Sequence, residues 1–164
     1  MTLSDEVYDF LTFDDCEHTV FASVGNNWDR TVSIYSGGKL LNVTGWRIGW
    51  AIGPPELLRL GGIISNGVFY CCNVPGQIAV ANSIDKIQTP GFSGNSSFLD
   101  ETRQLFIQNR DYIAKRAEEL NSPVKVLVCE GGYFCMLDIT GCVGIIPDKY
   151  LTSHDYEEKP LEGH

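Results

Sequence analysis

One lysine stands in a glycine-rich segment that separates two short apolar runs. The segment reads Ser36-Gly-Gly-Lys39, with Thr31–Tyr35 before it and Gly45–Gly53 after it. The β-branched and aromatic residues of both runs predict short strands, and the two glycines let the backbone turn between them without steric cost. Ser36 is then expected to close the first strand and Arg47 to open the second. Both would lie at one edge of a sheet.

The residue types in this segment suit a phosphorylated aldehyde. The amine of Lys39 can form an imine with a carbonyl compound that other groups hold in place. Arg47 offers a charged fork that matches phosphate oxygens, and the hydroxyl of Ser36 can donate one hydrogen bond. The alternative is that Lys39 is a solvated loop residue, which is the usual role of a lysine in a glycine turn.

A second cluster lies near the N-terminus. Asp5 and Tyr8 follow Met1–Leu3, which we interpret as the end of a strand. Ligands of open α/β sheets bind beyond the carboxyl ends of the strands. A carboxylate there can keep a pyridine nitrogen protonated, and a phenol can bond a ring oxygen. The alternatives are a cap or turn role for Asp5 and a core position for Tyr8.

With both clusters in view, the chain resembles the class I (fold type I) aminotransferases, which use pyridoxal 5'-phosphate. It is most similar to the group of kynurenine aminotransferase, glutamine transaminase K and cysteine-S-conjugate β-lyase. The resemblance covers most of residues 1 to 140 and indicates a middle fragment of such an enzyme. The motifs that carry it are Ser4–Tyr8, Ser36–Lys39, Asn42–Trp50, Ile52–Pro54 and Glu130–Phe134.

The resemblance implies a role for each site residue. Lys39 is expected to be the catalytic Schiff-base lysine, and Asp5 the partner of the pyridinium nitrogen. Tyr8 would donate to the phenolic oxygen of the cofactor, while Ser36 and Arg47 would bind its phosphate. The resemblance also implies a homodimer for the full-length enzyme. Phe69 and Tyr70 are the residues expected to reach the neighbouring subunit.

The resemblance also implies an α/β fold. Residues 1–96 are expected to form part of the large cofactor-binding domain, with a mixed, mostly parallel sheet and flanking helices. Residues 97–121 would form a long interdomain helix, and residues 122–146 the start of the small α+β domain. Residues 147–164 are expected to be a polar, extended tail.

The sequence itself predicts several elements. Proline at a first turn predicts one helix from Pro54, weakened at Gly61-Gly62, and another from Pro75. Apolar residues at helical spacing predict a long helix from Ser97 to Leu120. Two strands are expected at Val124–Val128 and Tyr133–Ile139, joined by a tight turn.

The implied function is transamination of an amino acid with a 2-oxo acid, with a kynurenine, glutamine or aromatic type of donor and an added β-lyase activity. Two alternatives stay open. The chain could be a non-catalytic fragment that retains the lysine but is incompetent alone. It could also be a phosphate-binding module without imine chemistry.

Composition excludes several other classes of function. A net charge of -9 and a pI near 4.7 argue against nucleic acid as a partner. No apolar run approaches the roughly 20 residues of a membrane span, so we expect no membrane association. The six cysteines lack metal-ligand spacing, so no metal site is expected. We expect a cytoplasmic location, and a mitochondrial one is also compatible with the full-length protein.

Overall fold

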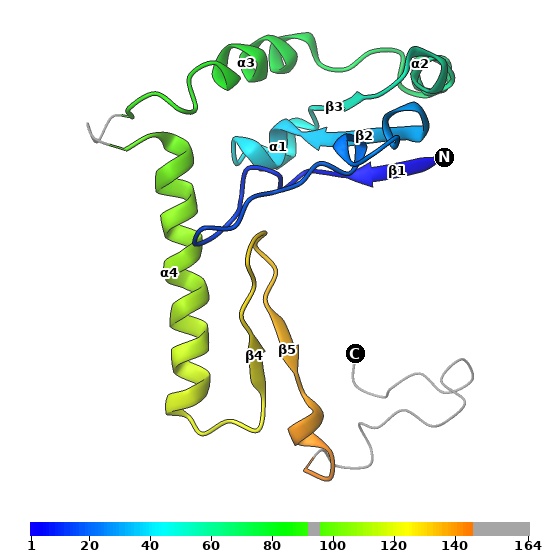
Figure 1. Cartoon of the computed structure of the whole chain (residues 1–164). Helices are drawn as coiled ribbons and strands as arrows, with labels where there is room; N and C mark the ends of the chain where they lie inside the picture. The colour runs from blue at the N-terminus through cyan, green and yellow to red at the C-terminus, as the bar shows by residue number, and fades with distance from the viewer. Residues whose placement is uncertain (92–95, 146–164) are drawn as a thin grey trace. The chain divides into compact units, whose positions relative to one another are not determined.

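A computed structural model of the chain describes residues 1–91 and 96–145. Its larger sheet has three strands in the order β1-β2-β3 (Figure 1). β1 and β2 run parallel, whereas β2 and β3 run antiparallel. The strands are β1 (Thr2–Asp5), β2 (Thr31–Ser36) and β3 (Gly49–Ile52).

The parallel pair places two predicted site residues at one edge of this sheet. Asp5 ends β1 and pairs with Ile34, two residues before Ser36 ends β2. The strands expected at the N-terminus and at Thr31–Tyr35 are therefore confirmed. Because parallel strands end at the same edge, Asp5 and Ser36 lie near each other in the backbone, a proximity that the sequence analysis did not specify.

The two glycines before Lys39 do not form the flexible turn that we expected. They begin a short helix, α1 (Gly37–Leu40), and neither has a positive φ. Their lack of a side chain matters for packing instead. A Cβ on Gly37 would lie 2.8 Å from Cγ1 of Val80, and one on Gly38 would lie 2.8 Å from Cα of Thr44.

The second predicted strand begins later than expected. Residues Thr44–Trp46 form a 3-10 turn, η3, and β3 starts only at Gly49. Arg47 ends η3 in the left-handed region, at φ 57°. The expectation that Arg47 opens the strand is therefore wrong, because a left-handed residue cannot continue into an extended ladder.

Two helices follow the sheet: α2 (Pro55–Phe69) and α3 (Val74–Ile84). We expected Gly61-Gly62 to weaken α2, but the helix continues through both glycines to Phe69. Neither glycine takes the positive φ of a terminating residue, which Tyr70 takes instead at 64°. α3 confirms the helix expected at Pro75, and the side chain of Asn73 caps it by accepting from the amide of Gly76 at 3.0 Å.

The long helix α4 (Phe98–Glu119) is confirmed to within one residue at each end. Ser97 caps its N-terminus: its Oγ accepts from the amide of Asp100 at 3.1 Å and donates to the Asp100 carboxylate at 2.7 Å. This reciprocal arrangement satisfies a free amide of the first turn. The start of α4 is thus fixed by its own sequence.

The chain divides into two compact units. The first contains Met1–Ile107 and Glu130–Tyr133, and the second contains Gln108–Cys129 and the residues from Phe134 onward. The second holds an antiparallel pair, β4 (Lys125–Leu127) and β5 (Met136–Asp138), which confirms two expected strands at shorter length. The four-part domain division remains a prediction, and its tail, residues 147–164, lies outside the described residues.

The core of the described residues is small and belongs to the first unit. Many large apolar side chains remain exposed, among them Ile64 and Val68 of α2, each at 65%. No helix of the described part combines the length and apolar character needed to cross a bilayer. The buried apolar residues are Leu11, Phe13, Ala22, Ile48 and Val80.

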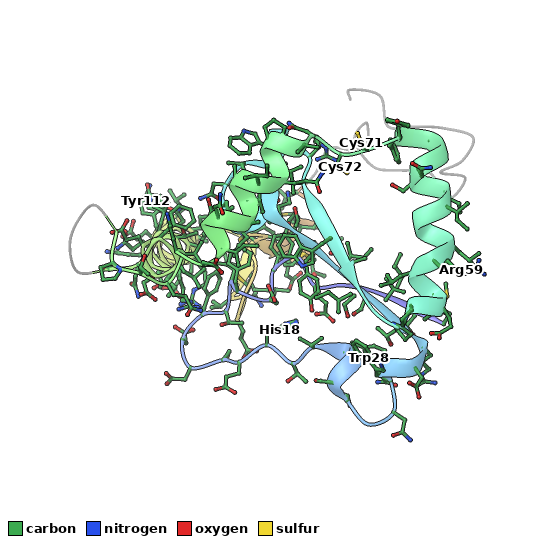
Figure 2. All side chains as sticks on the ribbon, turned by 90° about the horizontal axis from the view of Figure 1, so that it is seen from above. His18, Trp28, Arg59, Cys71, Cys72 and Tyr112 are labelled. Atoms are coloured by element: carbon green, nitrogen blue, oxygen red, sulfur yellow. The ribbon has the colours of Figure 1, made fainter. Side chains whose placement is uncertain are left out.

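A buried carboxylate ties the connection between β1 and β2 to the end of β1. Glu6 is only 4% exposed and accepts hydrogen bonds from Ser4 Oγ at 2.8 Å and from the amide of Phe21 at 3.0 Å. Nε2 of His18, which lies on this connection (Figure 2), is 2.6 Å from the second carboxylate oxygen. Burial alone would raise the pKa of Glu6, but these hydrogen bonds from Phe21, Ser4 and His18 together hold the pKa below its ordinary value.

We expect Glu6→Gln to lower the free energy of unfolding near neutral pH by about 1–3 kcal/mol, the cost of weakening buried hydrogen bonds to a charged group. Because the folded-state pKa is lowered, the contribution of Glu6 is complete above its ordinary pKa of 4.5 and is lost as the pH falls below it. Urea unfolding from pH 7 to 3 should therefore show a flatter acid limb in the variant. The neighbouring exposed Glu17→Gln should keep the wild-type profile, and an equally steep limb in Glu6→Gln would contradict the assignment.

Candidate functional site

The amine of Lys39 contacts a tyrosine that is remote in the sequence. Lys39 lies in the last turn of α1, and its Nζ donates a hydrogen bond to the phenol oxygen of Tyr133 at 2.8 Å. The same nitrogen is 5.3 Å from the ring centroid. We regard the hydrogen bond as the main interaction, because the nitrogen lies beyond the hydroxyl rather than over the ring face.

Backbone hydrogen bonds bring the Glu130–Tyr133 segment to this position. The amide of Phe13 donates to the carbonyl of Glu130 at 2.8 Å, and the amide of Gly132 donates to the carbonyl of Leu11 at 2.8 Å. The prediction of a simple tight turn between the two strands is therefore incomplete, since this segment pairs with residues 11–13. The pairing places Tyr133 in the same unit as Lys39.

Glycine is required at Gly131 and at Gly132 for two different structural reasons. A Cβ on Gly131 would lie 2.8 Å from the carbonyl oxygen of Leu11, so the close approach of the two backbones requires glycine there. Gly132 has φ +72°, a conformation that other residues adopt only at a cost. The Gly-Gly dipeptide thus permits both the contact and the bend.

Aromatic rings fix the orientation of Tyr133. The rings of Tyr8 and Tyr133 form a T-shaped pair at a centroid distance of 5.0 Å and an angle of 84°, and Phe106 of α4 stacks on Tyr133 at 6.0 Å and 22°. Such edge and offset geometries are the favoured ones for aromatic pairs. Arg103, one turn before Phe106, donates to the carbonyl of Phe10 at 3.2 Å and so ties the start of α4 to the same region.

These side chains line a cleft of about 250 Å³ within the first unit. Its wall combines an amine, two phenols, an amide and apolar rings, which is the mixed lining typical of small-molecule sites. The lining residues are Tyr8, Phe10, Leu11, Gly38, Lys39, Asn42, Thr44, Thr102, Phe106 and Tyr133.

The two phenols of the cleft differ in acidity. Burial and a hydrogen bond to Tyr133 raise the pKa of Tyr8 to about 12. Hydrogen bonds from Lys39 and then Tyr8 hold the pKa of Tyr133 below its ordinary value. Tyr8 is therefore a protonated donor at neutral pH, while the oxygen of Tyr133 accepts from both neighbours.

Asp5 and Ser36 lie at the sheet edge next to α1. Asp5 is exposed, and one carboxylate oxygen accepts from the amide of Val7 at 3.4 Å. Ser36 caps α1, with its Oγ accepting from the amide of Lys39 at 3.3 Å. A capping role for Ser36 was not part of the sequence interpretation, although serine before a helix is a known signal.

Arg47 is exposed, and its guanidinium lies 3.5 Å from the carbonyl of Thr44. Arg47, Asp5 and Ser36 are not among the lining residues of the cleft. The structure thus brings Lys39 and Tyr8 together in the cleft, whereas Asp5, Ser36 and Arg47 lie outside its lining. The cofactor roles of all five residues remain predictions.

Tyr133 is the site residue that sequence reasoning missed, since we placed it only at the start of a strand. The available signal was the Gly-Gly pair directly before it. Within the described residues, no group of three potential metal ligands occurs, and none of the six cysteines forms a disulfide. The adjacent Cys71 and Cys72 lie on the connection between α2 and α3 (Figure 2). Neither of them lines this cleft.

Comparison with known proteins decides the family. A family model described as aminotransferase class I and II matches residues 1–151. The chain belongs to this family. Its members are enzymes that depend on pyridoxal 5'-phosphate, and the fold described above is part of the fold type I architecture.

Individual relatives agree with this assignment. Kynurenine–oxoglutarate transaminase 1 of Rattus norvegicus is 33% identical over 147 residues, which cover 89% of this chain and 34% of that protein. The crystal structure of Bna3p from Saccharomyces cerevisiae matches with a TM-score of 0.74 at 30% identity, covering 96% of this chain and 35% of that one. N-Succinyldiaminopimelate aminotransferase from Mycobacterium tuberculosis matches with a TM-score of 0.70 at 31% identity, covering 80% and 32%. The chain therefore spans about a third of the length of these relatives.

The residues present fit the aldehyde end of the family's cofactor. The cleft offers one amine, at Lys39, and one protonated phenol, at Tyr8, and their two hydrogen bonds already converge on a phenol oxygen, that of Tyr133. The cofactor carries a phenolic oxygen beside its aldehyde, so the donor set matches. The anionic end has candidates at the sheet edge in Ser36 and Arg47.

Proposed function

We propose that this chain is the cofactor-binding part of an enzyme that transfers an amino group between an amino acid and a 2-oxo acid. The observation that carries this proposal is the amine of Lys39 beside the phenol of Tyr8 in a cleft of a class I and II aminotransferase fold. We further propose an amino donor of the kynurenine, glutamine or aromatic type. The relative named kynurenine–oxoglutarate transaminase 1 supports this choice.

Each residue has a role in this proposal. Lys39 holds the cofactor, Tyr8 donates to its phenolic oxygen, Asp5 keeps its ring nitrogen protonated, and Ser36 and Arg47 bind its phosphate. The bound cofactor supplies an electron sink that makes the Cα–H bond of an amino acid acidic. Nζ of Lys39 then accepts and returns the proton, which is general acid–base work by a positioned amine.

The same machinery allows a second outcome, the β-lyase activity. If the amino acid carries a good leaving group on Cβ, loss of the Cα proton to Lys39 can be followed by departure of that group. Comparing a kynurenine-type donor with a cysteine conjugate, in the enzyme that contains this chain, would show which outcome dominates.

The proposal is tested by trapping the cofactor on the chain. The purified protein is incubated with pyridoxal phosphate, reduced with borohydride, digested and mapped by mass spectrometry. The proposal requires labelling that saturates and that is confined to Lys39. Labels scattered over the exposed lysines would contradict it.

One observation favours the alternative of a chain that is incompetent by itself. Asp5, Ser36 and Arg47 do not line the cleft that Lys39 lines, so the chain alone could bind the cofactor weakly. Scattered labelling would support this alternative. Binding of inorganic phosphate that depends on Arg47, without any adduct on Lys39, would instead support the phosphate-binding module.

We also propose a homodimer for the full-length enzyme. Phe69 and Tyr70 are 72% and 83% exposed at the end of α2. Large aromatic side chains with this exposure are typical of protein contacts. They support the prediction that the end of α2 meets a neighbouring subunit.

A further inference from the structure

The phenol oxygen of Tyr133 occupies the meeting point of the two donors that the cofactor needs. Lys39 Nζ donates to this oxygen at 2.8 Å. Tyr8 donates to the same oxygen. In the proposed function, the amine of Lys39 must instead reach an aldehyde carbon, and Tyr8 must donate to the phenolic oxygen next to it. Tyr8 has one hydroxyl proton, and Lys39 keeps at most one N–H once its nitrogen is bonded to an aldehyde carbon, so these donors cannot serve both phenolic oxygens at once.

We propose that Tyr133 is an internal competitor of the cofactor: its phenol imitates the cofactor's phenolic ring and must leave before Lys39 can react. This inference rests on the proposed function and names a regulation of that same site. It concerns a residue outside the five to which a cofactor role is assigned.

The way in which Tyr133 is attached to the rest of the first unit supports this role. Two backbone hydrogen bonds join the Glu130–Tyr133 segment to the Leu11–Phe13 segment, and Tyr133 is 41% exposed. Rotation of the ring away from Tyr8 and Phe106 would release both donors while the backbone pairing remains. A half-exposed ring can make this change without opening the core.

The arrangement of hydrogen-bond donors around the Tyr133 oxygen also supports the proposed competition with the cofactor. Two donors on one phenol oxygen favour its ionised form. The donors that face it are the charged amine of Lys39, from α1, and the neutral phenol of Tyr8, from the chain after β1, with the Asp5 carboxylate acting on Tyr8. The cofactor's phenolic oxygen is an acceptor of the same kind. Competition between two similar acceptors for one pair of donors is therefore expected.

The test is the concentration of pyridoxal phosphate that gives half-maximal borohydride-trapped labelling of Lys39. Tyr133→Phe keeps the ring and removes the oxygen, so this concentration should fall about tenfold, as expected when one hydrogen bond to a charged group no longer has to be broken. The matched control is Tyr112→Phe on α4, where Tyr112 is 65% exposed (Figure 2), and it should behave as the wild type. An unchanged or increased concentration in Tyr133→Phe would overturn the inference.

A second readout first detects the contact of Lys39 with Tyr133 in the absence of the cofactor. A short bifunctional reagent, 1,5-difluoro-2,4-dinitrobenzene, should join Lys39 to Tyr133 in the wild-type chain, and saturating pyridoxal phosphate should suppress this product. Absence of the product, or its persistence while Lys39 still accepts the label, would overturn the inference and leave the proposed function intact. Failure of Lys39 to accept the label in every variant would defeat the proposed function and this inference with it.

Discussion

Replacing Lys39 with alanine should abolish the specific borohydride-stable attachment of pyridoxal phosphate to the chain. The yellow absorbance that the cofactor acquires when joined to a lysine should also disappear. The reason is that Lys39 is the lysine that lines the cleft with Tyr8, and an imine requires a primary amine at that position. Absorbance spectra and peptide mapping before and after reduction measure both effects.

The fold of this variant should be intact. Lys39 is half-buried in a short helix, and its amine makes its hydrogen bond with the partly exposed Tyr133. Alanine is a better helix former than lysine, so the expected change in the free energy of unfolding is within about 0.5 kcal/mol. Lys115→Ala, which alters a lysine side chain that is 74% exposed, is the control and should label normally. Full labelling of Lys39→Ala would refute the assigned role of this lysine.

Local signals in the sequence predicted most of the elements correctly. α4 was expected from Ser97 to Leu120 and spans Phe98–Glu119, because its start depends on a serine cap and its length on an apolar period. β2 was expected from its β-branched residues and was found. These features depend on neighbours within a few positions, which the sequence displays directly.

Features that depend on remote contacts were not predicted. Gly37 and Gly38 looked like a flexible turn, but they are small because Val80 and Thr44 approach them. Arg47 looked like the first residue of a strand, but it ends a 3-10 turn with a positive φ. Each error concerns packing or backbone bending that residue type alone does not specify.

The candidate site also contains residues that the sequence predicted and one that it did not. The resemblance to aminotransferases singled out Lys39 and Tyr8, which the structure places in one cleft. Tyr133 was missed because its approach to Lys39 depends on the pairing of Leu11 with Gly132. No periodicity or motif spacing reveals a backbone pairing across such a separation. A glycine pair before an aromatic residue marks the bend but not the partner.

Replacing Gly131 with alanine should separate the Glu130–Tyr133 segment from the Leu11–Phe13 segment. The added Cβ would lie 2.8 Å from the carbonyl oxygen of Leu11, a backbone atom that cannot move aside by itself. Overpacking of this kind costs about 1–3 kcal/mol, which should appear as a lower midpoint in urea unfolding. Gly45→Ala is the matched control, because a Cβ there meets nothing within 4 Å, and it should leave the midpoint unchanged.

The same variant separates two roles of Tyr133. If Tyr133 competes with the cofactor, Gly131→Ala should weaken the cross-link between Tyr133 and Lys39 and lower the pyridoxal phosphate concentration that half-saturates Lys39. If Tyr133 instead holds Lys39 ready to react, the cross-link should weaken and the half-saturating concentration should rise. A cross-link of wild-type yield in a destabilised chain would show that the contact does not depend on the backbone pairing. The hydrogen bond of Lys39 to Tyr133, at 2.8 Å, predicts the first result because it engages the amine that has to react.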